Sequence, residues 1–236
     1  MSEYCIEVAA ELARWARLGD AAQFIEELVA DASLIRGIEA CVRDEPGFRT
    51  KTWSSPLELG VFRATLYALL RSIKPARAIE SGVLHGLTSA FMLNALERNG
   101  HGRLTSIDLP SFFETGPSNQ DGFADTLPRG RRSGWAVPAY LQGRWDLRLG
   151  SSRDLLAECL TGEPVGLFLH DSEHTYDTMW FELSTAWPAL MSGGFLVCDN
   201  VDTSTAFFDL CRSVGQAPFI VAQDRHGPIR FGVLRK

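Results

Sequence analysis

The sequence predicts an α/β fold built around a doubly wound, mostly parallel sheet of seven strands. Short apolar segments alternate with amphipathic ones from residue 76 to residue 215, and strands separated by helices form parallel sheets covered on both faces. Two further apolar segments, joined by the turn sequence RHGP, end the chain and predict a terminal antiparallel hairpin. Periodic segments before residue 45 predict helices that precede the sheet.

The segments before the first strand predict an N-terminal helical cap. Residues 4–44 carry apolar side chains at spacings of three and four with charged residues between them, which is typical of amphipathic helices. On this basis we divide the chain into the cap, residues 1–51, and a main domain, residues 52–236. The cap either packs on the main domain or joins two chains in a homodimer.

The main domain is predicted element by element from its apolar segments and turn signals. Helices are expected at 52–75, 87–100, 152–160, 176–191 and 203–215. Strands are expected at 76–81, 103–108, 145–150, 165–171, 194–200, 219–224 and 229–235. Residues 110–140, rich in glycine, proline and serine, are predicted to form a long loop or lid.

The composition argues against several classes of protein. The net charge of −6 disfavours a nucleic-acid partner, because surfaces that bind nucleic acid usually show a basic excess. The five cysteines include no CxxC pair, and their odd number disfavours a disulfide framework. The acidic N-terminus is unlike a signal peptide, and no apolar run approaches the ~18–20 residues of a membrane span. We therefore expect a cytoplasmic protein without a membrane or nucleic-acid partner.

The first strand ends in a glycine-containing turn, at the edge of the sheet where open parallel sheets bind ligands. In IESGVLHGLTS, Gly82 and Gly86 flank the turn into a helix. Glycine lets the backbone approach a ligand closely, and a helix N-terminus favours an anion. The dinucleotide fingerprint needs a third glycine that this turn lacks, and Glu80 would repel pyrophosphate but can hold an ammonium group. The alternative is a tight turn that binds nothing.

The next two strands end in groups suited to a nucleoside. Asp108 ends the second strand and can accept hydrogen bonds from both hydroxyls of a ribose. The third strand ends in LGSSRD, whose small polar side chains suit an adenine edge. Both segments have a second interpretation, because aspartate and serine are also common helix N-caps.

The fourth and fifth strands end in oxygen-rich groups. Asp171 ends one strand, and Asp199 and Asn200 end the other. Two carboxylates and an amide oxygen suit a hard cation such as Mg²⁺. His174 lies three residues beyond Asp171, where it can act as a general base beside the metal. Alternatively, Asp199 and Asn200 form a turn, Asp171 caps the next helix, and His174 is a surface or capping residue.

These segments resemble class I S-adenosylmethionine-dependent methyltransferases, which have a Rossmann-like sheet. AIESGVLHGLTS is similar to their first motif, and SIDL to the segment that carries their ribose-binding acid. FLHDSEHTYDTMWFELSTAWPALMSGGFLVCDNV resembles the metal-dependent O-methyltransferases, such as catechol O-methyltransferase and bacterial enzymes acting on sugars and other natural products. That family has an Asp after strand four and an Asp-Asn pair after strand five. The resemblance covers residues 52–236 and leaves out the N-terminal helices.

The resemblance implies a role for each matching residue. Cofactor binding is implied, from the methionine end to the adenine end, for Glu80, Gly82, Gly86, Thr88, Asp108, Ser151 and Ser152, and also for Asp171. Coordination of Mg²⁺ or another divalent cation is implied for Asp171, Asp199 and Asn200. His174 stands where members with a catechol substrate have lysine, so the resemblance implies a base there but not that substrate.

The residues and the resemblance together predict an S-adenosylmethionine-dependent O-methyltransferase. A divalent cation would lower the pKa of a hydroxyl on a small-molecule acceptor, His174 would take the proton, and the oxygen would attack the methyl group in line. Three alternatives stay open: a metal-independent methyltransferase, a nicotinamide-dependent oxidoreductase, and a binding protein without catalysis. The missing third glycine and Glu80 disfavour the oxidoreductase.

Overall fold

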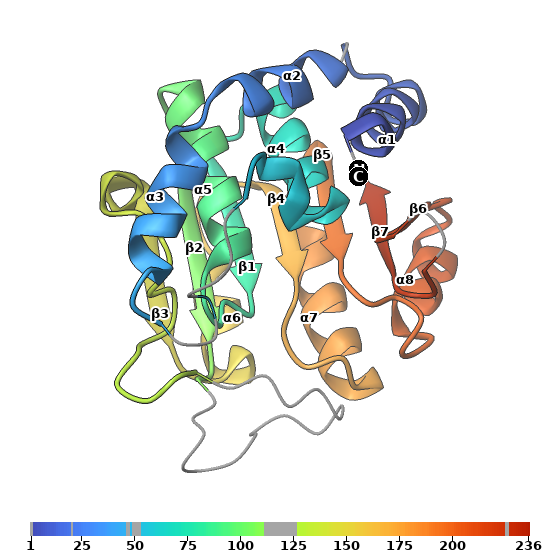
Figure 1. Cartoon of the computed structure of the whole chain (residues 1–236). Helices are drawn as coiled ribbons and strands as arrows, with labels where there is room; N and C mark the ends of the chain where they lie inside the picture. The colour runs from blue at the N-terminus through green and yellow to red at the C-terminus, as the bar shows by residue number, and fades with distance from the viewer. Residues whose placement is uncertain (1, 20, 46–47, 49–52, 111–126, 225–226) are drawn as a thin grey trace.

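A seven-stranded sheet in the order β3-β2-β1-β4-β5-β7-β6 forms the centre of the protein (Figure 1). The computed structural model describes residues 2–19, 21–45, 48, 53–110, 127–224 and 227–236. The parallel strands are β1 (Arg77–Ser81), β2 (Arg103–Asp108), β3 (Trp145–Leu149), β4 (Val165–His170) and β5 (Leu190–Cys198). The antiparallel strand β7 (Arg230–Arg235) lies between β5 and β6 (Phe219–Ala222). The predicted mostly parallel sheet with a terminal hairpin is confirmed.

Helices cover both faces of the sheet (Figure 1). One buried core lies beneath α1 (Ser2–Ala16), α2 (Ala22–Ala30), α3 (Ser33–Val42), α4 (Val61–Ile73) and α5 (Leu87–Asn99). The other lies beneath α6 (Ser152–Cys159), α7 (Tyr176–Ala189) and α8 (Ala206–Val214). In β4, Leu167 and Leu169 enter the first core and Phe168 the second, because successive side chains of a strand point to opposite faces.

Two element boundaries differ from the prediction by more than three residues. The helix expected at 52–75 is divided at Gly60, whose φ of +102° separates the 3₁₀-helix η1 (Pro56–Leu59) from α4. Strand β5 begins at Leu190 rather than at residue 194, because Leu190 already pairs with Val165 of β4 before a bulge. Neither change moves the carboxyl end of a strand, so the predicted site positions keep their places.

The segment predicted as a loop or lid, 110–140, is packed where the structure describes it. Residues 111–126 of the prediction lie outside the described residues. The N–H groups of Gly134 and Ala136 donate to carbonyl oxygens of the turn after β1 at 2.8 and 2.9 Å. The chain then enters the 3₁₀-helix η3 (Ala139–Arg144), which the prediction missed. The described part of this segment therefore forms a wall beside the turn.

The N-terminal helices pack on the main domain through the first core. Arg71 of α4 makes two hydrogen bonds to Glu27 of α2, each 2.8 Å long. Tyr4 of α1 donates to the carbonyl of Ala222 in β6 at 2.8 Å. The domain boundary at residue 52 and the homodimer stay predictions. Within the described residues, no helix has both the length and the apolar character needed to cross a membrane.

Candidate active site

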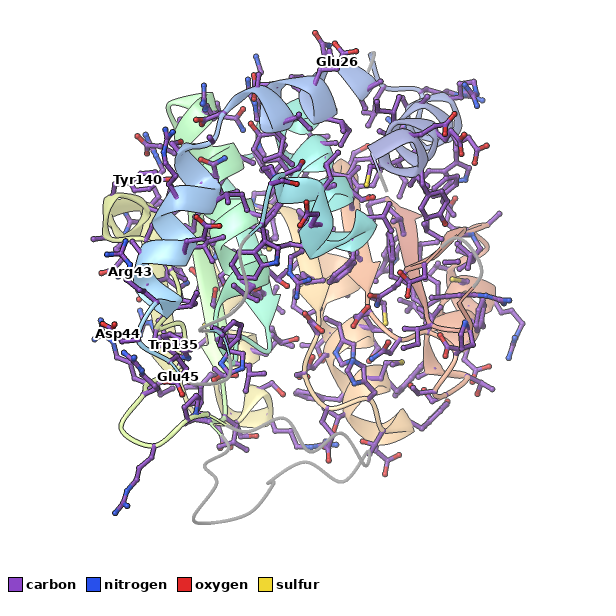
Figure 2. The ribbon with its side chains drawn as sticks, viewed as in Figure 1. Glu26, Arg43, Asp44, Glu45, Trp135 and Tyr140 are labelled. Carbon is purple, nitrogen blue, oxygen red and sulfur yellow. The ribbon has the colours of Figure 1, made fainter. Side chains whose placement is uncertain are left out.

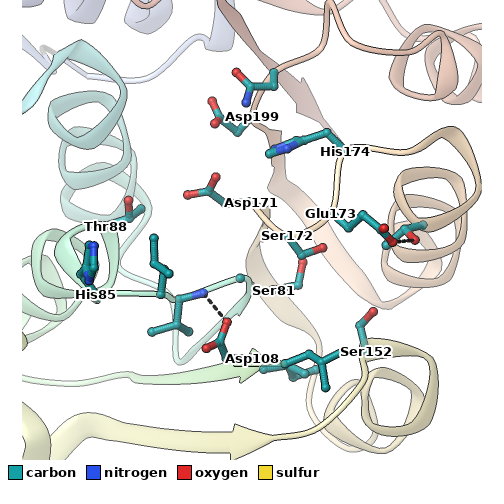
Figure 3. Close-up of a pocket in the computed structure, with 18 of the residues that line it drawn as sticks. Ser81, His85, Thr88, Asp108, Ser152, Asp171, Ser172, Glu173, His174 and Asp199 are labelled. Carbon is teal, nitrogen blue, oxygen red and sulfur yellow. Dashed lines mark hydrogen bonds between the residues drawn. The ribbon is translucent and has the colours of Figure 1, made fainter. Parts of the chain in front are cut away.

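A cavity of about 450 Å³ lies at the carboxyl ends of the parallel strands (Figure 3). The predicted site residues that line it are Gly82, Gly86, Thr88, Asp108, Ser151, Ser152, Asp171, His174, Asp199 and Asn200. The fold thus brings together groups that lie up to 118 residues apart, from Gly82 to Asn200. Open parallel sheets bind their ligands at this edge, so the cavity is the candidate active site.

The two glycines of the turn after β1 are required by close packing. Gly82 has a φ of +86°, and a Cβ there would lie 1.9 Å from the carbonyl oxygen of Asp171. Gly86 has a φ of +85°, and a Cβ there would lie 2.7 Å from the Val137 side chain and 2.8 Å from Gly134. Both positions need glycine for its backbone freedom and for its lack of a side chain. The turn is therefore wedged between the end of β4 and the wall formed by the loop segment.

Glu80 is the one predicted site residue that does not line the cavity. It is fully buried, and its Oε2 accepts hydrogen bonds from the hydroxyls of Ser89 and Ser106, each 2.7 Å long. Burial raises the pKa of Glu80 from 4.5 to about 7, although the two serine hydroxyls act in the opposite direction. Its two partners belong to α5 and β2, so the side chain lies between β1 and these two elements. Its contacts therefore fasten α5 and β2 to β1.

Asp108 at the end of β2 also holds the turn after β1. Its Oδ1 accepts from the backbone N–H of Val83 at 3.0 Å, and its Oδ2 accepts from the hydroxyl of Ser133, a residue that the sequence did not single out. Each carboxylate oxygen has a second lone pair, so acceptor capacity remains for a ligand. Ser151 caps α6 by accepting from the N–H of Arg153 at 3.2 Å, which confirms its helix-cap interpretation.

Asp171, His174 and Asp199 form a cluster at the other end of the cavity (Figure 3). One ligand atom from each of the three lies within 4.8 Å of the other two. Burial, together with the charge of Asp199, raises the pKa of Asp171 well above its usual range, and burial also raises the pKa of Asp199. Asn200 is buried beside them with a left-handed φ of +47°. Two carboxylates this close repel each other when ionised, so the cluster favours a bound cation or a proton.

Two hydrogen-bonding residues behind the cluster escaped the sequence prediction. Gln223, which follows β6, donates its side-chain amide to Asp199. Glu182 of α7 is fully buried, accepts from the Ser172 hydroxyl at 2.8 Å, and lies 2.6 Å from Nδ1 of His170. The sequence signal that could have identified Glu182 is an acidic residue among the apolar residues of a predicted helix. Its contacts fix the end of β4, from which the cluster extends.

An aromatic group borders the cavity beside the turn after β1. His85 lines the cavity, and its Nδ1 lies 3.0 Å from Nε1 of Trp135. Because an indole N–H only donates, Nδ1 accepts and the ring carries its proton on Nε2. Arg131 lies over the Trp135 ring at 4.6 Å and pairs with Glu45, which follows α3, at 3.1 Å. Figure 2 labels Trp135 and Glu45 on this side of the protein. These contacts connect the N-terminal helices to the turn.

The sequence matches a family model described as "Methyltransferase domain" over residues 79–201, more than half of the chain. The chain belongs to this methyltransferase family. The matched residues run from β1 to the end of β5, so they include the turn after β1 and both aspartates of the cluster. No curated protein matches the sequence of the methyltransferase.

Solved structures of other methyltransferases share the fold. The O-methyltransferase TomG from Streptomyces achromogenes, involved in tomaymycin synthesis and solved with SAM, has a TM-score of 0.59 and 17% identity, with 90% of this chain and 93% of that chain covered. The O-methyltransferase from Bacillus cereus, solved with SAH, has a TM-score of 0.59 and 14% identity, with 98% and 100% covered. Methyltransferase PaMTH1 from Podospora anserina, also SAH-bound, has a TM-score of 0.54 and 12% identity, with 97% and 95% covered. At these identities the likeness shows the fold.

Proposed function

We propose that this methyltransferase transfers the methyl group of S-adenosylmethionine to a hydroxyl of a small molecule, with Mg²⁺ or another divalent cation bound in the cavity. The observation that carries the proposal is that one cavity joins the turn after β1 and Asp108 to Asp171, His174 and Asp199. Cofactor and acceptor can therefore lie side by side within it. Two proteins of the same fold are O-methyltransferases solved with SAM and SAH, which supports this choice of cofactor and reaction.

The cofactor is assigned to one part of the cavity, here called the nucleoside end: the turn 82–86, Thr88, Asp108, Ser151 and Ser152. The turn would face the methionine portion, because residues 82–86 line the cavity directly before α5. The ribose hydroxyls would donate to Asp108, whose oxygens retain acceptor capacity. Ser151 and Ser152 at the start of α6 would lie beside the adenine. The proposal thus keeps the predicted order along the cofactor, without Glu80.

A divalent cation fits the donors at the other part of the cavity, here called the acidic end: Asp171, His174, Asp199 and Asn200. Burial raises the pKa values of Asp171 and Asp199, and the charge of Arg63 offsets this only in part, so a bound cation would stabilise the ionised pair. Carboxylate and amide oxygens suit Mg²⁺, which keeps its other positions for water or substrate oxygens. Asp171, Asp199 and Asn200 would hold the ion, and Gln223 would keep Asp199 oriented through its hydrogen bond.

The chain's own residues supply positioning and a base. A bound divalent cation makes a coordinated hydroxyl more acidic. His174 is buried at the edge of the acidic end, where its imidazole can take the hydroxyl proton. The turn after β1 and the end of β4 hold cofactor and acceptor in one orientation, so the oxygen can attack the sulfonium methyl in line. Glu182 keeps the end of β4 in place through Ser172 and His170.

Calorimetric titration with S-adenosylmethionine tests the cofactor assignment. We expect binding by the wild type and a roughly 10- to 100-fold weaker affinity in Asp108→Ala, because the ribose loses a charged acceptor. Asp146→Ala serves as the control, because Asp146 pairs with Arg148 on the surface of β3 outside the cavity. Absence of binding by the wild type would reject the proposed function.

A metal-independent methyltransferase is the second candidate. Arg63, which lines the cavity, places a positive charge near Asp171 and Asp199 and so supplies part of the charge that an ion would provide. Under this alternative the acid pair is structural. Cofactor binding that EDTA and Mg²⁺ leave unchanged, together with turnover unaffected by EDTA, would favour it.

A further inference from the structure

Arg63 is a cationic residue of the cavity that neither the strand ends nor the matched family segment includes. It lies in the first turn of α4, at the wall of the cavity. Its Nη1 donates to the carbonyl of Leu59 at 2.6 Å. Its Nε is buried, and the described residues offer it no hydrogen-bond acceptor. A guanidinium has five N–H donors, so most of this group's binding capacity is unused by the described protein.

Three carboxylates lie near the positive charge of Arg63 without pairing with it. Asp171, Asp199 and Glu80 are the carboxylates whose charge acts on it, and none of them lies within ion-pair distance of its nitrogens. A partly buried cation without a close partner is costly. Arg153, the other arginine at the cavity wall, stacks over Phe181 at 5.1 Å and lies beside Ser151 and Ser152. Among the described residues, Arg63 is therefore the arginine of the acidic end, and it forms no ion pair with the acids near it.

A zwitterion fits this arrangement. An amino-acid group carries an ammonium, which needs an anion, and a carboxylate, which needs a cation, a few bonds apart. The planar guanidinium forms paired hydrogen bonds with a carboxylate, which an ammonium side chain does not do. Among the components of the proposed reaction, the methionine portion of S-adenosylmethionine is the amino-acid zwitterion, and it would lie at the turn after β1. Gly82 of that turn is in direct contact with the backbone of Asp171.

We propose that Arg63 binds the carboxylate of the methionine portion of S-adenosylmethionine. This inference rests on the proposed cofactor and adds a residue from α4, outside the matched segment 79–201. Under this proposal, Arg63 raises the affinity for ligands that carry the carboxylate over the affinity for ligands that lack it. A carboxylate on the methyl acceptor is the competing source for the same guanidinium.

The test compares two ligands that differ only in this carboxylate. S-adenosylhomocysteine and its decarboxylated analogue share the nucleoside, the thioether and the ammonium. Calorimetric titrations of both are made on the wild type, Arg63→Met and Arg63→Lys, with Arg212→Met on the exposed surface of α8 as the matched control. We expect Arg63→Met to weaken S-adenosylhomocysteine roughly 10- to 100-fold and the analogue less than about 3-fold. Arg63→Lys should show an intermediate loss, because it keeps the charge without the planar fork.

The possible outcomes lead to different conclusions. An unchanged affinity for S-adenosylhomocysteine in both Arg63 variants would overturn the inference and point to the acceptor or to the acid pair. Equal losses for both ligands would also overturn it, because the carboxylate would then not be what Arg63 recognises. If Arg63→Met does not fold, the ratio of the two affinities in Arg63→Lys decides. Absence of S-adenosylhomocysteine binding by the wild type would instead reject the proposed function.

Discussion

The two ends of the cavity differ in how completely the protein satisfies its own polar groups. At the nucleoside end, Asp108 accepts from Val83 and Ser133, and Ser151 caps α6. At the acidic end, Asp171 and Asp199 lie close together with raised pKa values, and Arg63 stands near them without a close ion pair.

This difference separates groups that the fold stabilises from groups that it holds for a ligand. The nucleoside end is fixed by hydrogen bonds and close packing that exist without any ligand. The acidic end keeps charges in an arrangement that costs stability, and a cation or a zwitterion would relieve that cost. Changes at the first end should therefore weaken the fold, whereas changes at the second should weaken binding and leave the fold intact or more stable.

The strongest test of the packed end is Gly82→Ala. The new Cβ would lie 1.9 Å from the carbonyl oxygen of Asp171, on a backbone with a φ of +86°. We expect the free energy of unfolding to fall by about 3–5 kcal/mol, from left-handed strain plus the clash. Chemical denaturation measures this free energy of unfolding. Gly100→Ala, at a φ of +73° with no atom within 4 Å, should lose only about 1–2 kcal/mol. Similar losses in both variants would show that packing at Gly82 does not matter.

Glu80→Gln tests whether the buried acid beneath the nucleoside end is structural. Its pKa of about 7, against an ordinary 4.5, means that the folded protein keeps a proton which the unfolded chain releases as pH rises. The free energy of unfolding should therefore fall between about pH 4.5 and pH 7 and level off above, a total contribution of about 3 kcal/mol. Denaturation at pH 5 and pH 8 should show a shallower dependence in Glu80→Gln than in the wild type. Glu163→Gln, on an exposed turn, is the control, and equal pH dependence in wild type and Glu80→Gln would contradict the assignment.

Asp199→Asn tests the acidic end in the opposite direction. Replacing one carboxylate by an amide of the same shape removes the repulsion with Asp171, while Gln223 can still donate to the remaining oxygen. We expect the metal-free variant to be more stable than the wild type by about 1–2 kcal/mol at pH 8, where both acids are most ionised. Thermal and chemical denaturation in EDTA measure the difference, with Asp146→Asn as a surface control. A loss of stability would mean that Asp199 is a structural group.

Trp135→Phe should have the smallest effect. It removes the indole donor to His85 while it keeps an aromatic ring beside Phe48, whose ring centroid lies 5.8 Å away. We expect a loss of about 1 kcal/mol in unfolding free energy. Nitrogen NMR of the imidazole should show the proton on Nε2 in the wild type and a mixture of tautomers in the variant. A mixture in the wild type would contradict the hydrogen bond as assigned.

The sequence predicts the sheet and most of the site because both depend on short local patterns. Asp108 ends strand β2, and Asp171 and Asp199 directly follow β4 and β5; the carboxyl ends of parallel strands meet at one edge. Glu80 also lies near a strand end, but its side chain packs beside α5 and does not line the cavity, so its contact with a cofactor stays a prediction.

Other residues of the site could not be found from such patterns. Arg63 and Glu182 come from two helices, and Gln223 comes from the turn after β6. Tertiary packing decides which of their surfaces face the site. Ser133 lies in a segment without periodicity, and its bond to Asp108 depends on how that segment packs against the turn after β1. Local spacing carries no information about these contacts.

The contrast between the two ends is tested most directly by titrating Mg²⁺ into the protein saturated with S-adenosylhomocysteine. The acidic end, as described, should bind one ion per chain in the wild type, and calorimetry should show no such binding in Asp199→Asn. Wild-type protein that takes up no ion, or an Asp199→Asn variant that binds it equally well, would contradict the view that this end is held ready for a cation.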